Sequence, residues 1–176
     1  MKKRAILTIL SVLVIFPFYF FVPSLKRDRN RYHGDEKFKA QQWEKAAHYY
    51  EKVLRFKGTF PKLTSRLGYC YLQLGDTTKA QRFLKASLQE DSTLLKSYRW
   101  LGDLHTAQKN WLNAARDFSR LIHLYRAHHT LSSEEAADYL YALDRLVFCQ
   151  LQLKQDSTAL RQLHDFASVL RTRVTP

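Results

Sequence analysis

The fold is decided by two consecutive segments of equal length, PKLTSRLGYCYLQLGDTTKAQRFLKASLQEDSTL (61–94) and LKSYRWLGDLHTAQKNWLNAARDFSRLIHLYRAH (95–128). Each segment carries a Leu-Gly pair, a small residue twelve positions after the glycine and a bulky residue four positions further on. A third copy of the frame precedes the first of these segments at the same interval. The shared positions are Gly34, Ala46 and Tyr50, then Gly68, Ala80 and Leu84, then Gly102, Ala114 and Phe118.

Small residues in this frame predict pairs of antiparallel helices that approach each other closely. We expect Gly68 to meet Ala80 across one such pair, while Leu67, Tyr71 and Leu84 fill the space on either side. One pair cannot bury both of its apolar faces, so neighbouring pairs must stack. The sequence therefore predicts an all-α solenoid.

The repeat resembles the tetratricopeptide repeat (TPR) family, whose unit of about 34 residues has a Trp-x-x-Leu-Gly-x-x-Tyr first helix and an Ala-x-x-x-Phe second helix. In repeats of this kind the first helices line a concave groove, so the resemblance implies a protein-binding surface. The matching residues are Leu67, Gly68, Tyr71 and Ala80 in one segment and Leu101, Gly102, Ala114 and Phe118 in the next.

An uncharged run at 5–22 follows the basic start of the chain. At about 1.5 Å per residue, a helix of this length spans about 27 Å, close to the roughly 30 Å hydrocarbon layer of a bilayer. The expected fold class is all-α, with an N-terminal transmembrane helix followed by a short TPR-like helix-turn-helix solenoid of three to four repeats. A cleaved signal peptide is the alternative, although Phe-Val-Pro-Ser-Leu-Lys stands where a small-residue cleavage site would lie.

Basic residues on both sides of this run leave its orientation open. Lys2, Lys3 and Arg4 favour an inside tail, whereas the basic residues of 26–31 favour the reverse. Because long domains cross membranes largely regardless of their charge, we expect repeats on the outer side. The predicted localisation is a single-pass membrane protein, in the inner membrane if the source is bacterial, with a periplasmic rather than a cytoplasmic domain.

The last repeat departs from the frame. Ser132-x-x-Glu135 predicts a capping box before a long apolar-periodic helix, and Val147 replaces the glycine. A final helix would carry Ala159, Leu163, Phe166 and Val169 on one face. The predicted organisation is a signal anchor at 1–23, a basic juxtamembrane connector at 24–31 and a solenoid at 32–173, with repeats at about 27–60, 61–94, 95–128 and 140–173 and an insertion at 129–139.

Composition and motifs point away from catalysis and from nucleic acid. The net charge is +13, but seven basic and one acidic residue in 1–31 supply +6 of it, and the rest is scattered among acids. Cys70 and Cys149 occupy buried positions of the repeats, as core thiols would. We expect no catalytic, cofactor or metal site, because His123, His128 and His129 have the spacing of surface residues and His105 takes the core position of Tyr71.

The predicted first helices present polar, basic and aromatic side chains to the concave side, which suit an acidic or extended peptide. An ordinary solvated face is the alternative. Some TPR proteins grip a free C-terminal carboxylate with a Lys-Asn-Asn-Lys-Arg set, but here only Lys96 matches and Arg31, Asp35, Arg66 and Trp100 stand at the other places. The candidate groove residues are Lys62, Arg66, Tyr69, Gln73, Lys96, Arg99, Asp103, Thr106, Tyr141, Asp144, Phe148 and Gln152.

Two functions remain open from the sequence. The first is a membrane-tethered, non-catalytic scaffold, assembly factor or accessory subunit that holds partner proteins at a membrane or envelope complex. The second is a peptide-binding adaptor of co-chaperone type that acts on exported or unfolded chains. The partners expected are proteins, together with the membrane through 5–22, and no nucleic acid.

Overall fold

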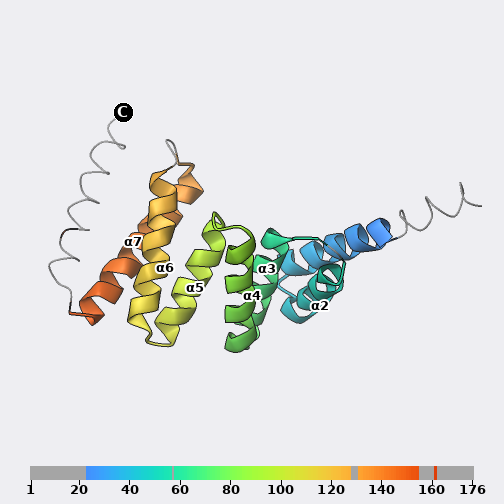
Figure 1. Ribbon diagram of the computed structural model, residues 1–176, viewed down its shortest axis with the longest axis horizontal. Coiled ribbons are helices and arrows are strands. Elements are labelled where there is room, and N and C mark those ends of the chain that lie inside the picture. Colours follow the sequence, from blue (N-terminus) through green and yellow to red (C-terminus); the bar gives the residue numbers. More distant parts are fainter. Residues whose placement is uncertain (1–22, 57, 128–130, 155–160, 162–176) are drawn as a thin grey trace, which may run out of the picture.

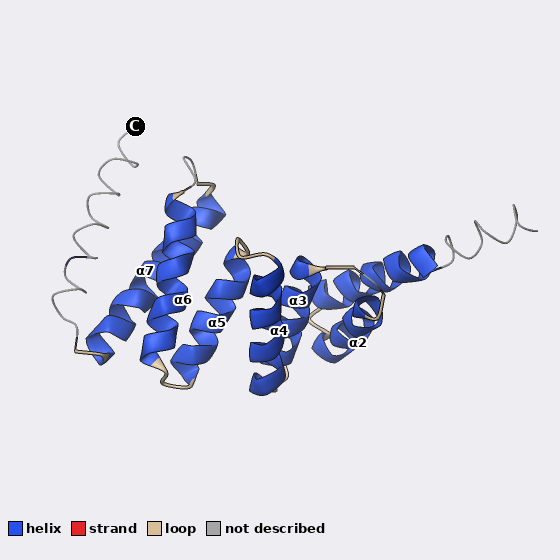
Figure 2. Ribbon diagram, viewed as in Figure 1, coloured by secondary structure: helices blue, strands red, loops and turns tan. Residues whose placement is uncertain are grey.

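The computed structural model describes residues 23–56, 58–127, 131–154 and 161, and this part of the chain contains helices and turns without a strand. The helices follow one another in a row from the 23–39 helix at one end to α7 at the other (Figures 1 and 2). After the 23–39 helix come α2 (Trp43–Leu54), α3 (Pro61–Gln73), α4 (Thr77–Glu90), α5 (Leu95–Ala107), α6 (Trp111–Arg126) and α7 (Ser133–Gln152).

The repeat frame of the sequence reappears as a period in the helix starts. The helices α2, α4 and α6 begin at Trp43, Thr77 and Trp111, which are evenly spaced along the chain. The helices α3 and α5 begin at Pro61 and Leu95, with the same separation. The predicted all-α solenoid of helix pairs is therefore confirmed.

Three glycines bring the two helices of each pair into close contact. A Cβ atom on Gly34 would lie 2.6 Å from the Tyr50 ring, and one on Gly102 would lie 2.7 Å from the Phe118 ring. On Gly68 it would lie 2.8 Å from Cγ of Leu84. The nearest side chain to Gly68 is thus that of Leu84 rather than the expected Ala80, because the bulky residue reaches across the helix pair into the space that the glycine leaves.

Capping side chains mark the starts of α4, α6 and α7. Asp76 accepts a hydrogen bond from the Lys79 backbone N–H at the start of α4. The predicted capping box of Ser132 and Glu135 is confirmed at the start of α7. In the α5–α6 turn the left-handed residue is Lys109, with φ 56°, and the next residue, Asn110, caps α6.

The buried residues form two clusters. One joins the end of the 23–39 helix to α2, α3, α4 and Leu104 of α5, and the other joins α6 to α7, with Leu95 and Tyr98 of α5 packed against it. At the junction of α3, α4 and α5, the buried Ser97 hydroxyl lies 2.6 Å from that of Ser65 and 2.8 Å from that of Ser87. Cys70 and Cys149 are buried free thiols, as predicted, and burial raises the pKa of Cys70 to about 12.

The membrane part of the predicted fold class is corrected by the structure. Within 23–154, apart from its undescribed gaps, no helix has both the length and the apolar character needed to cross a bilayer. This finding contradicts the predicted N-terminal transmembrane helix and the single-pass, periplasmic localisation derived from it. The predicted span at 5–22 itself lies outside the described residues, and 24–31, predicted as a connector, belongs to the 23–39 helix.

Several other predictions fall outside the described residues. They include His128 and His129, and the final helix expected around Ala159 to Val169. The repeat predicted at 140–173 is described only as far as Lys154, so its second helix stays a prediction.

Candidate functional site

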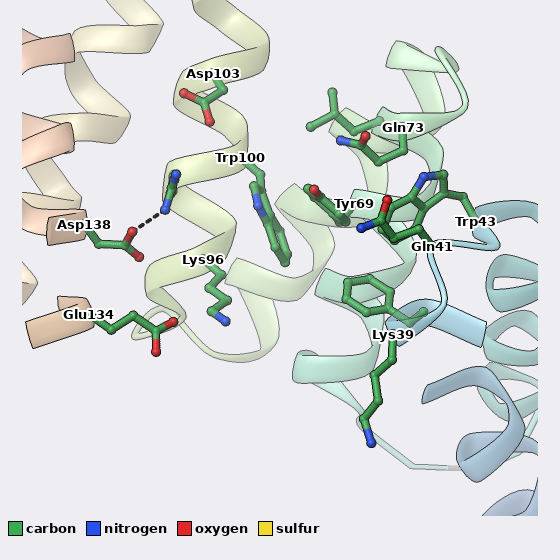
Figure 3. A pocket seen from close by; sticks show the side chains of 13 residues that line it. Lys39, Gln41, Trp43, Tyr69, Gln73, Lys96, Trp100, Asp103, Glu134 and Asp138 are labelled. Atoms are coloured by element: carbon green, nitrogen blue, oxygen red, sulfur yellow. Dashed lines mark hydrogen bonds and ion pairs between the residues drawn. The ribbon is translucent and has the colours of Figure 1, made fainter. Parts of the chain in front are cut away.

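A hollow of about 630 Å³ lies on the face formed by the first helices of the repeats, α3, α5 and the start of α7. We call it the aromatic hollow, because four rings from three repeats line it. In Figure 3, Trp100 and Tyr69 lie between Trp43 on one side and Asp138 on the other. Its lining residues are Phe38, Lys39, Gln41, Trp43, Tyr69, Leu72, Gln73, Lys96, Arg99, Trp100, Asp103, Glu134 and Asp138.

A second hollow of about 540 Å³ adjoins the first. We call it the basic hollow, because Lys62, Arg66 and Lys96 face a single acidic residue in its lining, Asp91. Phe38, Lys96 and Trp100 line both hollows, so the two form one groove with Trp100 at their boundary. The other residues of the basic hollow are Ser65, Thr93, Leu94 and Leu95.

The four rings of the aromatic hollow make a continuous contact chain. The ring centroids of Tyr69 and Trp100 are 4.4 Å apart with 32° between the planes, and Trp43 meets Tyr69 edge-on at 5.4 Å. Phe38 lies 5.4 Å from Trp43 and 5.6 Å from Tyr69. All four side chains are half-buried, so they keep surface available to a ligand. Such rings offer a large contact area for an apolar side chain at a small entropy cost.

Both arginines predicted for the groove are already paired. The Arg66 guanidinium lies 2.5 Å from the Asp35 carboxylate, which also accepts a hydrogen bond from the buried Tyr50 hydroxyl at 2.8 Å. The Arg99 guanidinium forms an ion pair with Asp138 near the start of α7. These two positive charges therefore serve contacts between helices.

Asp103 and Tyr141 also bind each other. The Tyr141 hydroxyl donates a hydrogen bond of 2.6 Å to Asp103, and the Arg99 guanidinium lies 4.5 Å from the centre of the Tyr141 ring. Burial raises the pKa of the Asp103 carboxyl above its ordinary value, despite the hydrogen bond from Tyr141. Burial likewise raises the pKa of the Tyr141 hydroxyl, to about 12. This pair holds α7 against α5 beside the groove.

Two lysines of the groove remain available. Lys62 and Lys96 are exposed, and neither forms an ion pair with another described residue. Lys39, by contrast, lies 3.4 Å from Glu36. In the basic hollow the only carboxylate, Asp91, accepts two hydrogen bonds from Thr93, at 2.9 and 2.6 Å. The unpaired positive charge of the groove is thus concentrated at Lys62 and Lys96.

Seven of the twelve candidate residues line the two hollows, namely Lys62, Arg66, Tyr69, Gln73, Lys96, Arg99 and Asp103. The other five line neither hollow. Thr106 donates a hydrogen bond to the Gly102 carbonyl, and Tyr141 is bound to Asp103. Asp144, Phe148 and Gln152 are exposed further along α7.

Several groove residues were not predicted from the sequence. Trp43 was not among the candidate groove residues, and Trp100 was noted only as a departure from the carboxylate-binding set. Trp43 and Trp100 come from different repeats, and each contacts the Tyr69 ring that lies between them. This arrangement forms only when the repeats stack. Asp138 could have been found from the capping box, because a helix that starts at Ser133 places it on the second turn, beside α5.

The buried histidine lies away from the groove. His105 is 3% exposed, its Nδ1 lies 2.7 Å from Asp117 Oδ2 and its Nε2 lies 3.0 Å from the Gln81 amide. These contacts join α4, α5 and α6, in agreement with the predicted core role. Among the described side chains, no group of three or more potential ligands could hold a metal ion.

Comparison with known proteins agrees with this geometry. Residues 37–98 match the family model of the tetratricopeptide repeat. The matched TPR segment runs from the end of the 23–39 helix to the start of α5 and includes most of the groove's aromatic residues. Among curated proteins, none matches the chain significantly.

Solved TPR structures share the fold. PcrH from Pseudomonas aeruginosa is 15% identical with a TM-score of 0.62, and the match covers 70% of this chain and 91% of PcrH. The Arabidopsis OM64 TPR domain is 19% identical with a TM-score of 0.58, covering 68% of this chain and 93% of that domain. The TPR2B domain of yeast Sti1, in a complex with pHsp70, is 17% identical with a TM-score of 0.59, covering 69% and 98%. At these identities the similarity establishes the TPR-like fold.

Proposed function

We propose that this chain is a non-catalytic protein-interaction module whose TPR groove binds an extended peptide segment of a partner protein. The observation that carries the proposal is the continuous set of half-buried rings, Phe38, Trp43, Tyr69 and Trp100, open on the groove side. Ligand-binding grooves are lined mainly by apolar and aromatic side chains that stay accessible, with a few polar groups beside them.

Neighbouring structures support a peptide ligand. PcrH has also been solved in complex with the chaperone-binding region of PopB, and the first TPR of Spaghetti (RPAP3) with an HSP90 peptide. These structures favour the peptide-binding adaptor of co-chaperone type over a scaffold as the proposed role of this chain.

An array of peptides of about 15 residues tests the proposal directly. We expect the wild-type chain to bind a broad set of peptides, and Trp100→Ala to lose most of that binding because it removes the central ring of the groove. Leu112→Ala is the matched control, since Leu112 is a 59% exposed apolar residue on α6 that lines neither hollow. Equal binding by wild type and Trp100→Ala would contradict the proposal.

The breadth of binding separates the two proposed roles. An adaptor should recognise many peptides weakly, whereas a scaffold, assembly factor or accessory subunit should recognise one partner sequence. The scaffold gains some support from α7, where Leu140 and Leu151 are 40% and 49% exposed and offer a second apolar contact. A single strong peptide that requires these α7 residues would favour the scaffold.

A further inference from the structure

We infer that the groove selects an internal peptide segment that carries an apolar side chain and an acidic side chain close together, one on each side of Trp100. This inference rests on the proposed function and specifies its ligand class. It follows from the division of the groove into an aromatic and a basic hollow, and from the different charges left unpaired in each.

The aromatic hollow has the chemistry of an apolar subsite. Its lining holds as many basic as acidic residues, Lys39, Lys96 and Arg99 against Asp103, Glu134 and Asp138, and Lys96 is shared with the basic hollow. Arg99 is bound to Asp138 and Asp103 to Tyr141, so a charged ligand group would have to break these contacts. The rings and Leu72 instead stabilise an apolar side chain that is buried against them.

The basic hollow has the chemistry of an anionic subsite. Three cationic residues line it against one carboxylate, and that carboxylate is already hydrogen-bonded to Thr93. Arg66 is occupied by Asp35, which leaves the Lys62 and Lys96 ammonium groups to meet a ligand. An acidic side chain placed there is attracted by Lys62 and Lys96 and repelled by Asp91 alone, so the hollow keeps a net positive charge toward it.

The two subsites lie next to each other, because both are lined by Trp100. Trp100 lines both hollows, and Lys96, one turn before it on α5, also belongs to both. In an extended peptide, side chains two positions apart lie on the same side, about 7 Å from each other. A segment lying over the Trp100 edge can therefore place one side chain in each hollow.

The cationic groups of this subsite are lysines, and lysines can bind an internal acidic side chain as well as a C-terminal carboxylate. An exposed lysine is a point charge on a flexible stem and imposes no fixed geometry on a carboxylate, unlike a planar guanidinium fork. The one arginine of the basic hollow is engaged by Asp35. The subsite therefore recognises negative charge, which an internal Glu or Asp supplies as well as a free C terminus does.

Blocked synthetic peptides of about 12 residues in a Ser/Gly background test the inference by fluorescence anisotropy with the full chain. The parent peptide carries Leu and Glu two positions apart. Three single replacements, Glu by Gln, Glu by Lys and Leu by Ala, report on each subsite. A fourth variant of the parent peptide is left unblocked at its C terminus and so carries a free carboxylate.

We expect the Glu-to-Gln peptide to bind about threefold to tenfold more weakly at low salt, with the difference shrinking as salt screens the charges. In Lys62→Gln/Lys96→Gln the Glu and Gln peptides should bind alike, whereas Lys85→Gln, an exposed lysine of α4 outside both hollows, should keep the difference. Replacing the peptide Leu by Ala should weaken binding to wild type and to the double lysine variant. It should have no effect on binding to Trp100→Ala. The free carboxylate should change affinity by less than about twofold.

The outcomes separate this inference from the proposed function. Binding that depends on Trp100 but is equal for the Glu, Gln and Lys peptides would overturn the inference and leave the peptide-binding function standing. A strong requirement for the free carboxylate would also overturn it. No binding of these peptides, and none on the array, would overturn both. Circular dichroism of each variant establishes that its helices are intact.

Discussion

At Gly68 the chain has no room for a side chain, because Leu84 from α4 occupies the space above its Cα. Both the side chain and the backbone nitrogen of Leu84 lie within 3.0 Å of a Cβ placed on Gly68. The backbone cannot move aside as a flexible side-chain end can. The repeated glycine therefore sets the distance between α3 and α4.

We predict that Gly68→Ala lowers the free energy of unfolding by about 1–3 kcal/mol, because the overpacking cost exceeds the helix-propensity gain of about 1 kcal/mol. Urea denaturation followed by circular dichroism measures the change. Thr78→Ala, an exposed site on α4, is the control and should be nearly neutral. An unchanged midpoint for Gly68→Ala would show that the overpacking cost is no larger than the helix-propensity gain, which contradicts the prediction.

Asp103 gives a pH-dependent prediction. Burial raises the pKa of its carboxyl above the ordinary 3.8, so the folded state holds the proton more tightly than the unfolded state. The protonated carboxyl thus favours folding below the unfolded pKa, and this contribution is lost as pH rises through the folded pKa. Asp103→Asn should retain the hydrogen bond from Tyr141 without the buried charge.

The variant should therefore gain stability relative to wild type at neutral pH, and the gain should shrink as pH falls to about 3.5. Urea unfolding at both pH values measures this difference. A variant that is less stable at neutral pH would contradict the assignment, because it would mean that Arg99 and Arg145 stabilise the carboxylate more than burial penalises it.

At the scale of the helix, the start of α7 depends on its capping box. Ser132 accepts from the Glu135 backbone N–H, and the Glu135 side chain accepts from the Ser132 backbone N–H at 2.8 Å. Asp138, which holds Arg99, lies in the second turn of the same helix. The cap therefore supports the α5–α7 contact beside the groove.

Ser132→Ala should destabilise the chain by about 1 kcal/mol, because it removes the acceptor for an otherwise unpaired helix N–H. The neighbouring exposed Ser133→Ala should have little effect, since Ser133 is the first residue inside the helix and caps nothing. Thermal and urea unfolding of both variants give the comparison. Equal losses would show that the serine side chains matter for some reason other than the cap.

Helices with a complete frame could be predicted from the sequence, and those that depend on their surroundings could not. The residue types of Gly68, Ala80 and Leu84 recur at a constant interval because the two helices of each pair pack together in the same way. The 24–31 segment has no such pattern, but Lys and Arg have good helix propensity and continue the 23–39 helix. The role of Asn110 as an N-cap could not be predicted, because asparagine suits a left-handed residue and an N-cap equally.

At the scale of the whole molecule, the groove arises only from the stacking of repeats. The sequence identifies the first-helix positions of Lys62, Tyr69 and Lys96, which follow from helical periodicity. It cannot show that Arg66 and Arg99 are neutralised, because Asp35 and Asp138 reach them from other repeats. Of the basic groove residues predicted from the sequence, Lys62 and Lys96 are thus left without an ion pair to another described residue.

The membrane prediction failed at this same scale. It rested on the hydropathy of one short run, 5–22, whose length only just matches a bilayer. In the described part of the chain, the helices bury their apolar faces against one another, and none has the length and apolarity of a membrane span. The proposed function therefore depends on the groove alone.

A hollow beside α2 is an alternative surface for peptide binding. A hollow of about 790 Å³ lies on the side of α2, lined by residues that include Lys45, Tyr49 and Glu51. It is larger than either groove hollow, but its lining holds two basic and two acidic residues and lacks the four-ring set of the aromatic hollow. Peptide binding at this surface would give affinity without involving the groove.

The most direct measurement is an NMR titration of the isotope-labelled chain with the Leu/Glu peptide. We predict that the largest backbone amide shifts cluster at Tyr69, Lys96 and Trp100, and that Trp100→Ala lowers affinity about tenfold, or about 1.4 kcal/mol. Shifts confined to Lys45, Tyr49 and Glu51, with full affinity in Trp100→Ala, would contradict the account.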